Sequence, residues 1–108
     1  MGGLLSSNSS DDEVLQALQT PNRLVIDCRS PGEFSAGDGF TGALNIPVDS
    51  VEKRLNEFGD KKRTIITYCA AGARSCRAAD TLKTNGFLSV FSTTNANHLR
   101  EIARRLPK

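Results

Sequence analysis

The sequence has no tryptophan, one tyrosine and one histidine, and aromatic residues make up 6% of its 108 positions. Proteins that bind single-stranded nucleic acid stack bases on aromatic side chains, and those that bind duplexes present a strongly basic surface. Here the formal net charge is only +2, from 14 basic and 12 acidic residues. We therefore expect no nucleic-acid partner.

Long apolar runs are also absent. No stretch approaches the ~18 consecutive apolar residues that a transmembrane helix needs. The chain is long enough for one soluble domain with its own core. We assign residues 10–108 to that domain, expect a monomer, and treat residues 1–9 as a flexible tail. The tail fits the Met-Gly-x-x-x-Ser pattern of N-myristoylation, with Gly2 and Ser6 in register, but the short motif favours a disordered tail of small residues over acylation.

The three cysteines, Cys28, Cys69 and Cys76, are an odd number without a C-x-x-C pair, and no cleavable signal peptide precedes them. This pattern favours a reducing, cytoplasmic compartment. A zinc site would need all three thiols and His98 at spacings unlike the usual ligand pairs, so we expect no metal and no other cofactor. We expect His98 near the start of the last helix, solvated or capping it. Any catalysis must therefore proceed without a histidine base.

Capping and periodicity signals predict five helices. Capping boxes at Ser10–Glu13 and Ser30–Glu33 each begin one helix. Apolar residues on one face and terminal residues mark the other three. The third helix has Val51, Leu55 and Phe58 on one face, begins at a cap from Asp49 or Ser50 and ends at Gly59. The fourth runs from Ser75 to Asn85 and is followed by Gly86, and the last is marked by Leu99, Ile102, Ala103 and Leu106.

Four short apolar runs, at 24–28, 43–46, 64–68 and 88–91, are typical of buried strands. Strands joined by helices must run largely parallel. We therefore predict an α/β fold with a mostly parallel central sheet of four to five strands and helices on both faces. In such sheets ligands bind beyond the carboxyl ends of the strands. Cys69 follows the third run and so lies at that edge.

The segment 64–80, TIITYCAAGARSCRAAD, predicts a strand that ends on a cysteine and a loop that leads into a helix. Cys69 would face the backbone N–H groups of this loop, with the positive end of the helix dipole behind it and Arg74 on the rim. Such surroundings lower the pKa of a thiol from its usual value of ~8.5. We expect Cys69 to be a nucleophile, held by a loop made of Ala70, Ala71, Gly72, Ala73 and Ser75.

Three segments, LVIDCRSPGEF (24–34), GALNIP (42–47) and YCAAGARS (68–75), resemble the single-domain rhodaneses. The likeness covers about residues 10–106, and the Cys-x-x-Gly-x-Arg-Ser loop is the family's active-site signature. The resemblance implies a five-stranded α/β fold and a thiosulfate sulfurtransferase that carries sulfane sulfur as a persulfide. By position the persulfide cysteine is Cys69, the loop arginine is Arg74, and the family's acidic–basic pair is Asp27 with Arg29.

The chemistry of the loop fits a two-step transfer. A thiolate attacks the outer sulfur of thiosulfate or a related donor, sulfite leaves, and a cyanide or thiol acceptor then removes the sulfur. The loop amides would stabilise the persulfide and Arg74 would attract the donor, so neither a metal nor a general base is required. The expected partners are a small anionic sulfur donor and a thiol or cyanide acceptor.

Two segments depart from the family pattern. Residues 37–43 (GDGFTGA) are one residue longer than the family's Gly-His-Ile-x-Gly-Ala and lack its histidine, so the outer wall of the pocket should differ. Residues 92–97 (STTNAN) replace the family's Gly-Gly pair and would line the rim that faces Cys69. We expect these changes to affect donor and acceptor preference rather than the persulfide step.

Two other functions stay open: a cysteine-dependent phosphatase or arsenate reductase with a related loop, and a regulatory persulfide-binding module with weak turnover. From Cys69 to Arg74 the loop reads C-x4-R, whereas phosphate-binding cysteine loops read C-x5-R, and the shorter loop favours sulfur. The intact Cys69 argues against a purely inactive module.

Three further residue roles also stay open at this level. Cys28 is expected in the core, and Cys76 is either a core residue or a resolving thiol for Cys69. Asp27 with Arg29 is either a structural ion pair or a direct substrate contact.

Overall fold

The computed structural model describes residues 7–107, so the Gly2 and Ser6 acylation motif lies outside the described residues. The helices and strands in chain order are α1 (Asp11–Leu18), β1 (Leu24–Asp27), α2 (Pro31–Ser35), β2 (Leu44–Asn45), η1 (Val48–Ser50), η2 (Glu52–Phe58), β3 (Thr64–Cys69), α3 (Ala73–Thr84), β4 (Ser89–Asn95) and α4 (Ala96–Ala103). All strand pairs are parallel, in the order β2-β1-β3-β4. The predicted α/β fold is confirmed. The fifth strand that the resemblance implies is not found within residues 7–107.

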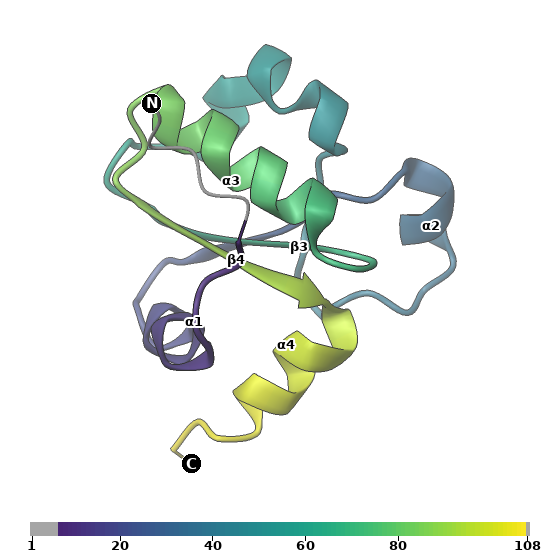
Figure 1. The fold of residues 1–108 in the computed structure, drawn as a ribbon, viewed down its shortest axis with the longest axis vertical. Helices are drawn as coiled ribbons and strands as arrows, with labels where there is room; N and C mark the ends of the chain where they lie inside the picture. The colour runs from purple at the N-terminus through teal and green to yellow at the C-terminus, as the bar shows by residue number, and fades with distance from the viewer. Residues whose placement is uncertain (1–6, 108) are drawn as a thin grey trace.

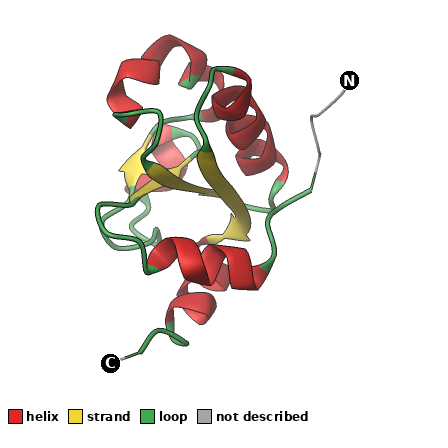
Figure 2. Cartoon of the chain, turned by 90° about the vertical axis from the view of Figure 1, so that its left-hand side faces the viewer, coloured by secondary structure: helices red, strands yellow, loops and turns green. Residues whose placement is uncertain are grey.

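Two helical layers enclose the sheet (Figures 1 and 2). Helices α1 and α4 cover one face, and α3 covers the other together with the 3-10 segments η1 and η2. Successive residues of a strand point to opposite faces, so Ile65 packs in the α3 layer and Ile66 in the α1–α4 layer, both fully buried. Burial of one such side chain stabilises the fold by about 1.5–3 kcal/mol. No helix in the part of the chain described here is long and apolar enough to cross a membrane.

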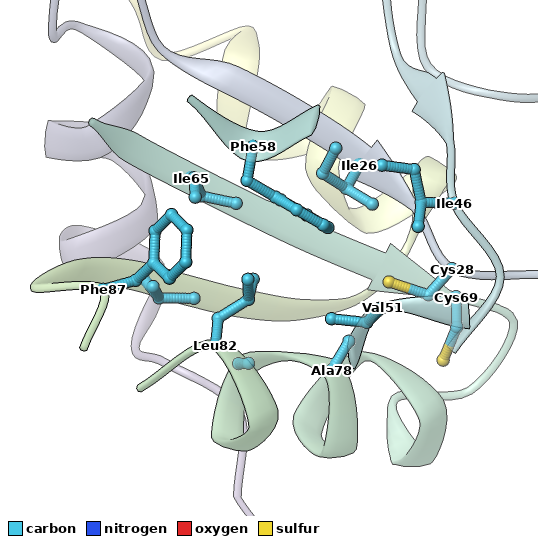
Figure 3. Packing of buried hydrophobic residues seen from close by; sticks show 12 residues of the cluster. Ile26, Cys28, Ile46, Val51, Phe58, Ile65, Cys69, Ala78, Leu82 and Phe87 are labelled. Carbon is cyan, nitrogen blue, oxygen red and sulfur yellow. The ribbon is translucent and has the colours of Figure 1, made fainter. Parts of the chain in front are cut away.

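The hydrophobic cluster on the α3 side of the sheet extends to the sheet edge where a site is expected (Figure 3). Phe87 lies at one end of this cluster, against the edge of Phe58 with ring centroids 6.1 Å apart. Cys28 and Cys69 lie at the other end, where β1 and β3 finish. The core therefore fixes the position of the strand end that presents Cys69.

Local capping signals are observed as predicted. In α1, Ser10 N donates to Glu13 Oε1 at 2.8 Å, and in α2, Ser30 N donates to Glu33 Oε1 at 3.0 Å. Gly86 has a φ of +93° after α3, a conformation that favours glycine. Such short-range contacts need no tertiary partner, which is why the sequence identifies them.

The α-helix predicted from Val51, Leu55 and Phe58 on one face is wrong, because the segment is a 3-10 helix rather than an α-helix. The segment forms two 3-10 pieces, η1 and η2, with a kink at Arg54 (φ −121°, ψ 29°) and no side-chain cap from Asp49 or Ser50. Val51 and Phe58 are nevertheless fully buried, as the apolar pattern predicts. Arg54 Nε donates to Glu57 Oε2 at 2.6 Å, an i to i+3 pair that suits the threefold repeat of a 3-10 helix.

The fourth strand is longer than the predicted run 88–91, because β4 continues to Asn95. The added residues are polar, yet Ser92 and Thr93 are buried, and the backbone of each takes part in a hydrogen bond. Ser9 N donates to Ser92 O at 2.8 Å, and Ser92 N donates to Ser9 Oγ at 3.0 Å. Ser9, which the sequence assigns to the tail, therefore pairs with the outer edge of β4.

Candidate active site

Cys69 ends β3, an inner strand of the sheet, and only 2% of its surface is exposed. The backbone N–H of Gly72 donates to its Sγ at 3.0 Å. Gly72 precedes α3 with a φ of +104°, and no side chain caps this helix. Because the N-terminal amides of a helix lack intrahelical partners, those of α3 are available to a negative charge on Cys69.

The pKa of Cys69 lies below the usual value for a thiol. Burial raises this pKa, but a hydrogen bond with the Ser75 hydroxyl and hydrogen bonds from the backbone amides of Ser75, Ala71 and Gly72 outweigh the burial and lower it. Ser75 Oγ lies 3.5 Å from Cys69 Sγ. The geometry thus favours the thiolate, the form that acts as a nucleophile.

A register shift between β3 and β4 orients the carbonyls around this thiol. Thr67 pairs with Ser92 but Cys69 pairs with Asn95, so β4 carries one extra residue. The Thr93 carbonyl accepts a hydrogen bond from Ser75 Oγ at 2.8 Å, and the Thr94 carbonyl lies 3.8 Å from Cys69 Sγ. The bulge therefore helps to hold Ser75 beside the thiol.

Replacing Gly72 by alanine should lower the free energy of unfolding by about 1–2 kcal/mol, because a left-handed φ is unfavourable for any residue with a Cβ. That Cβ would also lie 2.6 Å from Asn8 Nδ2. Urea denaturation monitored by circular dichroism measures the loss. Gly32→Ala is the matched control, since a Cβ there meets nothing within 4 Å and should leave stability equal or slightly higher. Equal stability of the two variants would contradict the requirement for glycine at position 72.

Arg74 lies at the start of α3 and is paired away from the thiol. Its Nη1 and Nη2 donate to Glu33 Oε1 and Oε2 of α2 at 2.7 and 3.2 Å. The hydrogen bond from Arg74 holds the pKa of Glu33 down at about 2, so the carboxylate stays charged. The charge expected to attract a donor is therefore largely compensated, and Arg74 links the start of α3 to α2.

Asp27 and Arg29 form a buried pair at the end of β1. The fully buried Asp27 carboxylate accepts hydrogen bonds from Arg29 Nε and Nη2, the latter at 2.8 Å, and from the Tyr68 hydroxyl at 3.0 Å. Tyr68 in turn accepts from Phe40 N at 2.9 Å. Burial raises the pKa of Tyr68 to about 12, so the hydroxyl remains a donor to Asp27.

This network ties the longer 37–43 loop to the sheet. Asp38 Oδ1 lies 3.2 Å from Arg29 Nη1. A Cβ at Gly39 would lie 2.9 Å from the Tyr68 hydroxyl, so glycine permits the close approach of the loop. The outer wall that the sequence predicts to differ therefore presents the Asp38 carboxylate to the cavity.

A cavity of about 260 Å³ opens in front of Cys69. Its lining comes from β3, β4, α4 and the loops that follow β1, α2 and β3, and comprises Arg29, Asp38, Cys69, Ala70, Asn95, Ala96, Asn97 and Arg100. The predicted rim contributes Asn95 to Asn97. Asp38 belongs to the predicted outer wall at 37–43. Sequence reasoning missed Arg100, because only the contact of this loop with α4 brings that residue to the cavity.

The other candidate residues lie outside this cavity. Cys28 is in the α3-side core, and burial strongly raises its pKa. Cys76 has 6% exposure, a raised pKa caused mainly by burial, and a contact of 3.2 Å with Asn8 Oδ1. His98 lies on α4, and its Nε2 is 2.8 Å from Oδ1 of Asp11 on α1. Among residues 7–107, no three His, Cys, Asp or Glu side chains cluster as metal ligands would.

Comparison with known proteins identifies the same family along most of the chain. Residues 10–96 match the family model of the rhodanese-like domain. The uncharacterized protein YqhL of Bacillus subtilis (strain 168) is 40% identical over 68 residues, which cover 63% of this chain and 52% of YqhL. A tRNA uridine(34) hydroxylase of Yersinia enterocolitica is 32% identical over 85 residues, which cover 74% of this chain and 24% of the hydroxylase.

The fold also matches solved structures. A structure of rhodanese with anions from E. coli is 32% identical in sequence with a TM-score of 0.57, and the match covers 68% of this chain and 84% of that protein. The chain spans about half the length of the first curated relative and a quarter of the second.

Proposed function

This chain belongs to the rhodanese-like domain family, and on that premise we propose that it is a thiosulfate sulfurtransferase that carries sulfane sulfur as a persulfide on Cys69. The main support is the lowered pKa of Cys69 beside the amides that precede and begin α3, at a cavity also lined by Arg29 and Arg100. A stabilised thiolate in an accessible cavity is what attack on a sulfur donor requires.

In the first half-reaction the Cys69 thiolate attacks the outer sulfur of thiosulfate. A new S–S bond forms, the bond between that sulfur and the sulfite group breaks, and sulfite leaves with the electron pair. The enzyme then holds an anionic persulfide, whose charge the amides of Ala71, Gly72 and Ser75 stabilise. A cyanide or thiolate acceptor attacks the outer sulfur and restores the Cys69 thiolate. No proton need move to a histidine in either step.

The named relatives support the reaction class to different degrees. Rhodanese from E. coli shares 32% identity with this chain, and the name of that protein denotes a sulfurtransferase. The hydroxylase match concerns a quarter of a longer protein, and we assign none of its named activity to this chain.

A phosphatase reaction is disfavoured by the same loop. Four residues separate Cys69 from Arg74, and the Arg74 guanidinium binds Glu33 instead of closing a cradle around the thiol. A phosphoryl group would need several donors around its oxygens at once. We therefore expect negligible hydrolysis of aryl phosphates.

We further propose a single domain over residues 10–108, acting as a monomer in the cytoplasm. Residues 1–9 precede it as a segment whose Ser9 is hydrogen-bonded to β4. The three cysteines are free thiols, which suits a reducing compartment. The partners would be a small anionic sulfur donor and a cyanide or thiol acceptor, with no cofactor.

Alkylation of Cys69 should follow a pH profile with a midpoint below the ~8.5 of a free cysteine, because its pKa is lowered. A lower pKa keeps the thiolate present at lower pH, so the rate should fall only when the pH drops below that midpoint. Ser75→Ala removes the hydroxyl whose hydrogen bond with Cys69 lowers the pKa of the thiol, and it should move the midpoint upward. Rates with iodoacetamide over a pH series measure it.

Ser92→Ala is the matched control, since its hydroxyl lies 4.0 Å from Cys76 Sγ rather than near Cys69. It should leave the Cys69 midpoint in place. A wild-type midpoint at or above that of a free cysteine would contradict the stabilised thiolate.

The proposed function is tested by sulfite release in the absence of an acceptor. Thiosulfate should release one sulfite per chain in a rapid phase and then stop, because the persulfide has no route onward. Addition of cyanide should restart turnover. Absence of the rapid phase, with aryl phosphate hydrolysed instead, would favour the phosphatase reading.

A further inference from the structure

Arg100 of α4 lines the Cys69 cavity and has no carboxylate partner among residues 7–107. Its Nη1 donates to the backbone carbonyls of Asp38 and Gly39 at 3.3 and 3.1 Å, and its Nη2 donates to Asn97 Oδ1. A guanidinium has five N–H donors. In the described part of the chain, Nε–H and one N–H of Nη2 of Arg100 have no protein acceptor.

The other two arginines near the thiol are neutralised. Arg29 is bound to the Asp27 carboxylate and lies 3.2 Å from the Asp38 carboxylate, so this trio carries a net charge of −1. Arg74 is bound by both oxygens of Glu33. The Cys69 thiolate adds another negative charge. Without a further cation, the cavity would repel an anionic donor.

We propose that Arg100 is the specificity-determining residue that binds the oxyanion end of the sulfur donor while Cys69 attacks its outer sulfur. The proposal rests on the proposed sulfurtransferase function. Arg100 brings the charge of the Arg29 group to zero and offers unused donors in the same cavity as the thiol. Arginine suits this role because its charge-assisted hydrogen bonds bind oxyanions strongly.

A purely structural role is the alternative, in which Arg100 only anchors the 37–43 loop through the Asp38 and Gly39 carbonyls. Both roles predict that removal of Arg100 lowers activity. The two roles predict different results for an anionic and a neutral reagent of similar size and reactivity. Loss of an anchor should slow the reactions of both reagents alike. Loss of an anion site should slow only the anionic reagent.

The test compares alkylation of Cys69 by iodoacetate, an anion, and by neutral iodoacetamide, in a Cys76→Ser background at low ionic strength. In each reaction the thiolate displaces iodide. For Arg100→Gln the ratio of the iodoacetate rate to the iodoacetamide rate should fall about five- to tenfold, an effect that salt should weaken. Arg100→Lys keeps the charge and should retain most of the wild-type ratio.

Arg104→Gln is the matched control, because it removes one positive charge from the segment just after α4 and Arg104 does not line the cavity. It should leave the ratio unchanged. An unchanged ratio in Arg100→Gln, or equal slowing of both reagents, would overturn the proposal.

Kinetics with thiosulfate separate this proposal from the proposed function. Arg100→Gln should raise KM for thiosulfate about tenfold with a smaller change in kcat, which indicates lost donor binding. An unchanged KM in an active enzyme would refute the role of Arg100 alone. A wild type without any sulfur transfer would refute the proposed function, whatever the alkylation ratio.

Discussion

Cys69→Ser is expected to lower the rate of thiocyanate formation from thiosulfate and cyanide by about a thousandfold or more, since removal of a catalytic nucleophile has effects of that order. A serine hydroxyl is far less ionised than a thiol and cannot form a persulfide. The backbone amides of Gly72 and its neighbours would remain in place, so the fold should be retained. A colorimetric thiocyanate assay with matched circular dichroism spectra measures both properties.

Cys76→Ala is the matched control for this prediction. Cys76 lies one turn into α3 and does not line the cavity, and burial raises its pKa. Its replacement should change the thiocyanate rate by less than about threefold, as expected for a residue without a catalytic role. A large loss of activity in Cys76→Ala, with activity retained in Cys69→Ser, would indicate that Cys76 rather than Cys69 carries the persulfide.

Asp27→Asn should lower the free energy of unfolding by about 3–5 kcal/mol, the range for breaking a buried ion pair on one side. Arg29, whose side chain is only 9% exposed, would lose its buried partner and keep only the ion pair with Asp38, whose side chain is 67% exposed. Its amide N–H₂ would also face donors, because Asp27 accepts from Arg29 and from the Tyr68 hydroxyl. Urea denaturation at neutral pH measures the change.

Tyr68→Phe provides the comparison, because it removes the hydrogen bonds to Asp27 and from Phe40 N but leaves the ion pair intact. It should lower the free energy of unfolding by about 1–2 kcal/mol. A loss in Asp27→Asn no larger than that in Tyr68→Phe would contradict a structural role for the Asp27–Arg29 pair. Loss of activity without loss of stability would favour direct contact with substrate.

The fold could be predicted from the sequence where its signals are local. The capping boxes at Ser10 and Ser30 involve residues three positions apart, and Gly86 requires a φ that few other residues adopt. Alternation of short apolar runs with helices was sufficient to predict a parallel sheet with Cys69 at its carboxyl edge. The amide environment of this thiol also follows from adjacent residues.

Features that depend on contacts between distant residues could not be predicted in this way. Arg74 pairs with Glu33, 41 positions away, and Arg100 reaches the carbonyl of Gly39, 61 positions away. Ser92 in the added part of β4 is hydrogen-bonded to Ser9, which is 83 positions away. A sequence pattern contains no signal for such partners when each residue alone is an ordinary surface type. The arrangement of charge around Cys69 therefore came only from the structure.

The most direct test of the account is the mass of the intact protein after incubation with thiosulfate, before and after cyanide, followed by peptide mapping under non-reducing conditions. Each chain should gain one sulfur atom, on the peptide that contains Cys69, and should lose it when cyanide is added. A chain that gains no sulfur, or gains it on Cys28 or Cys76, would contradict a persulfide carried by Cys69.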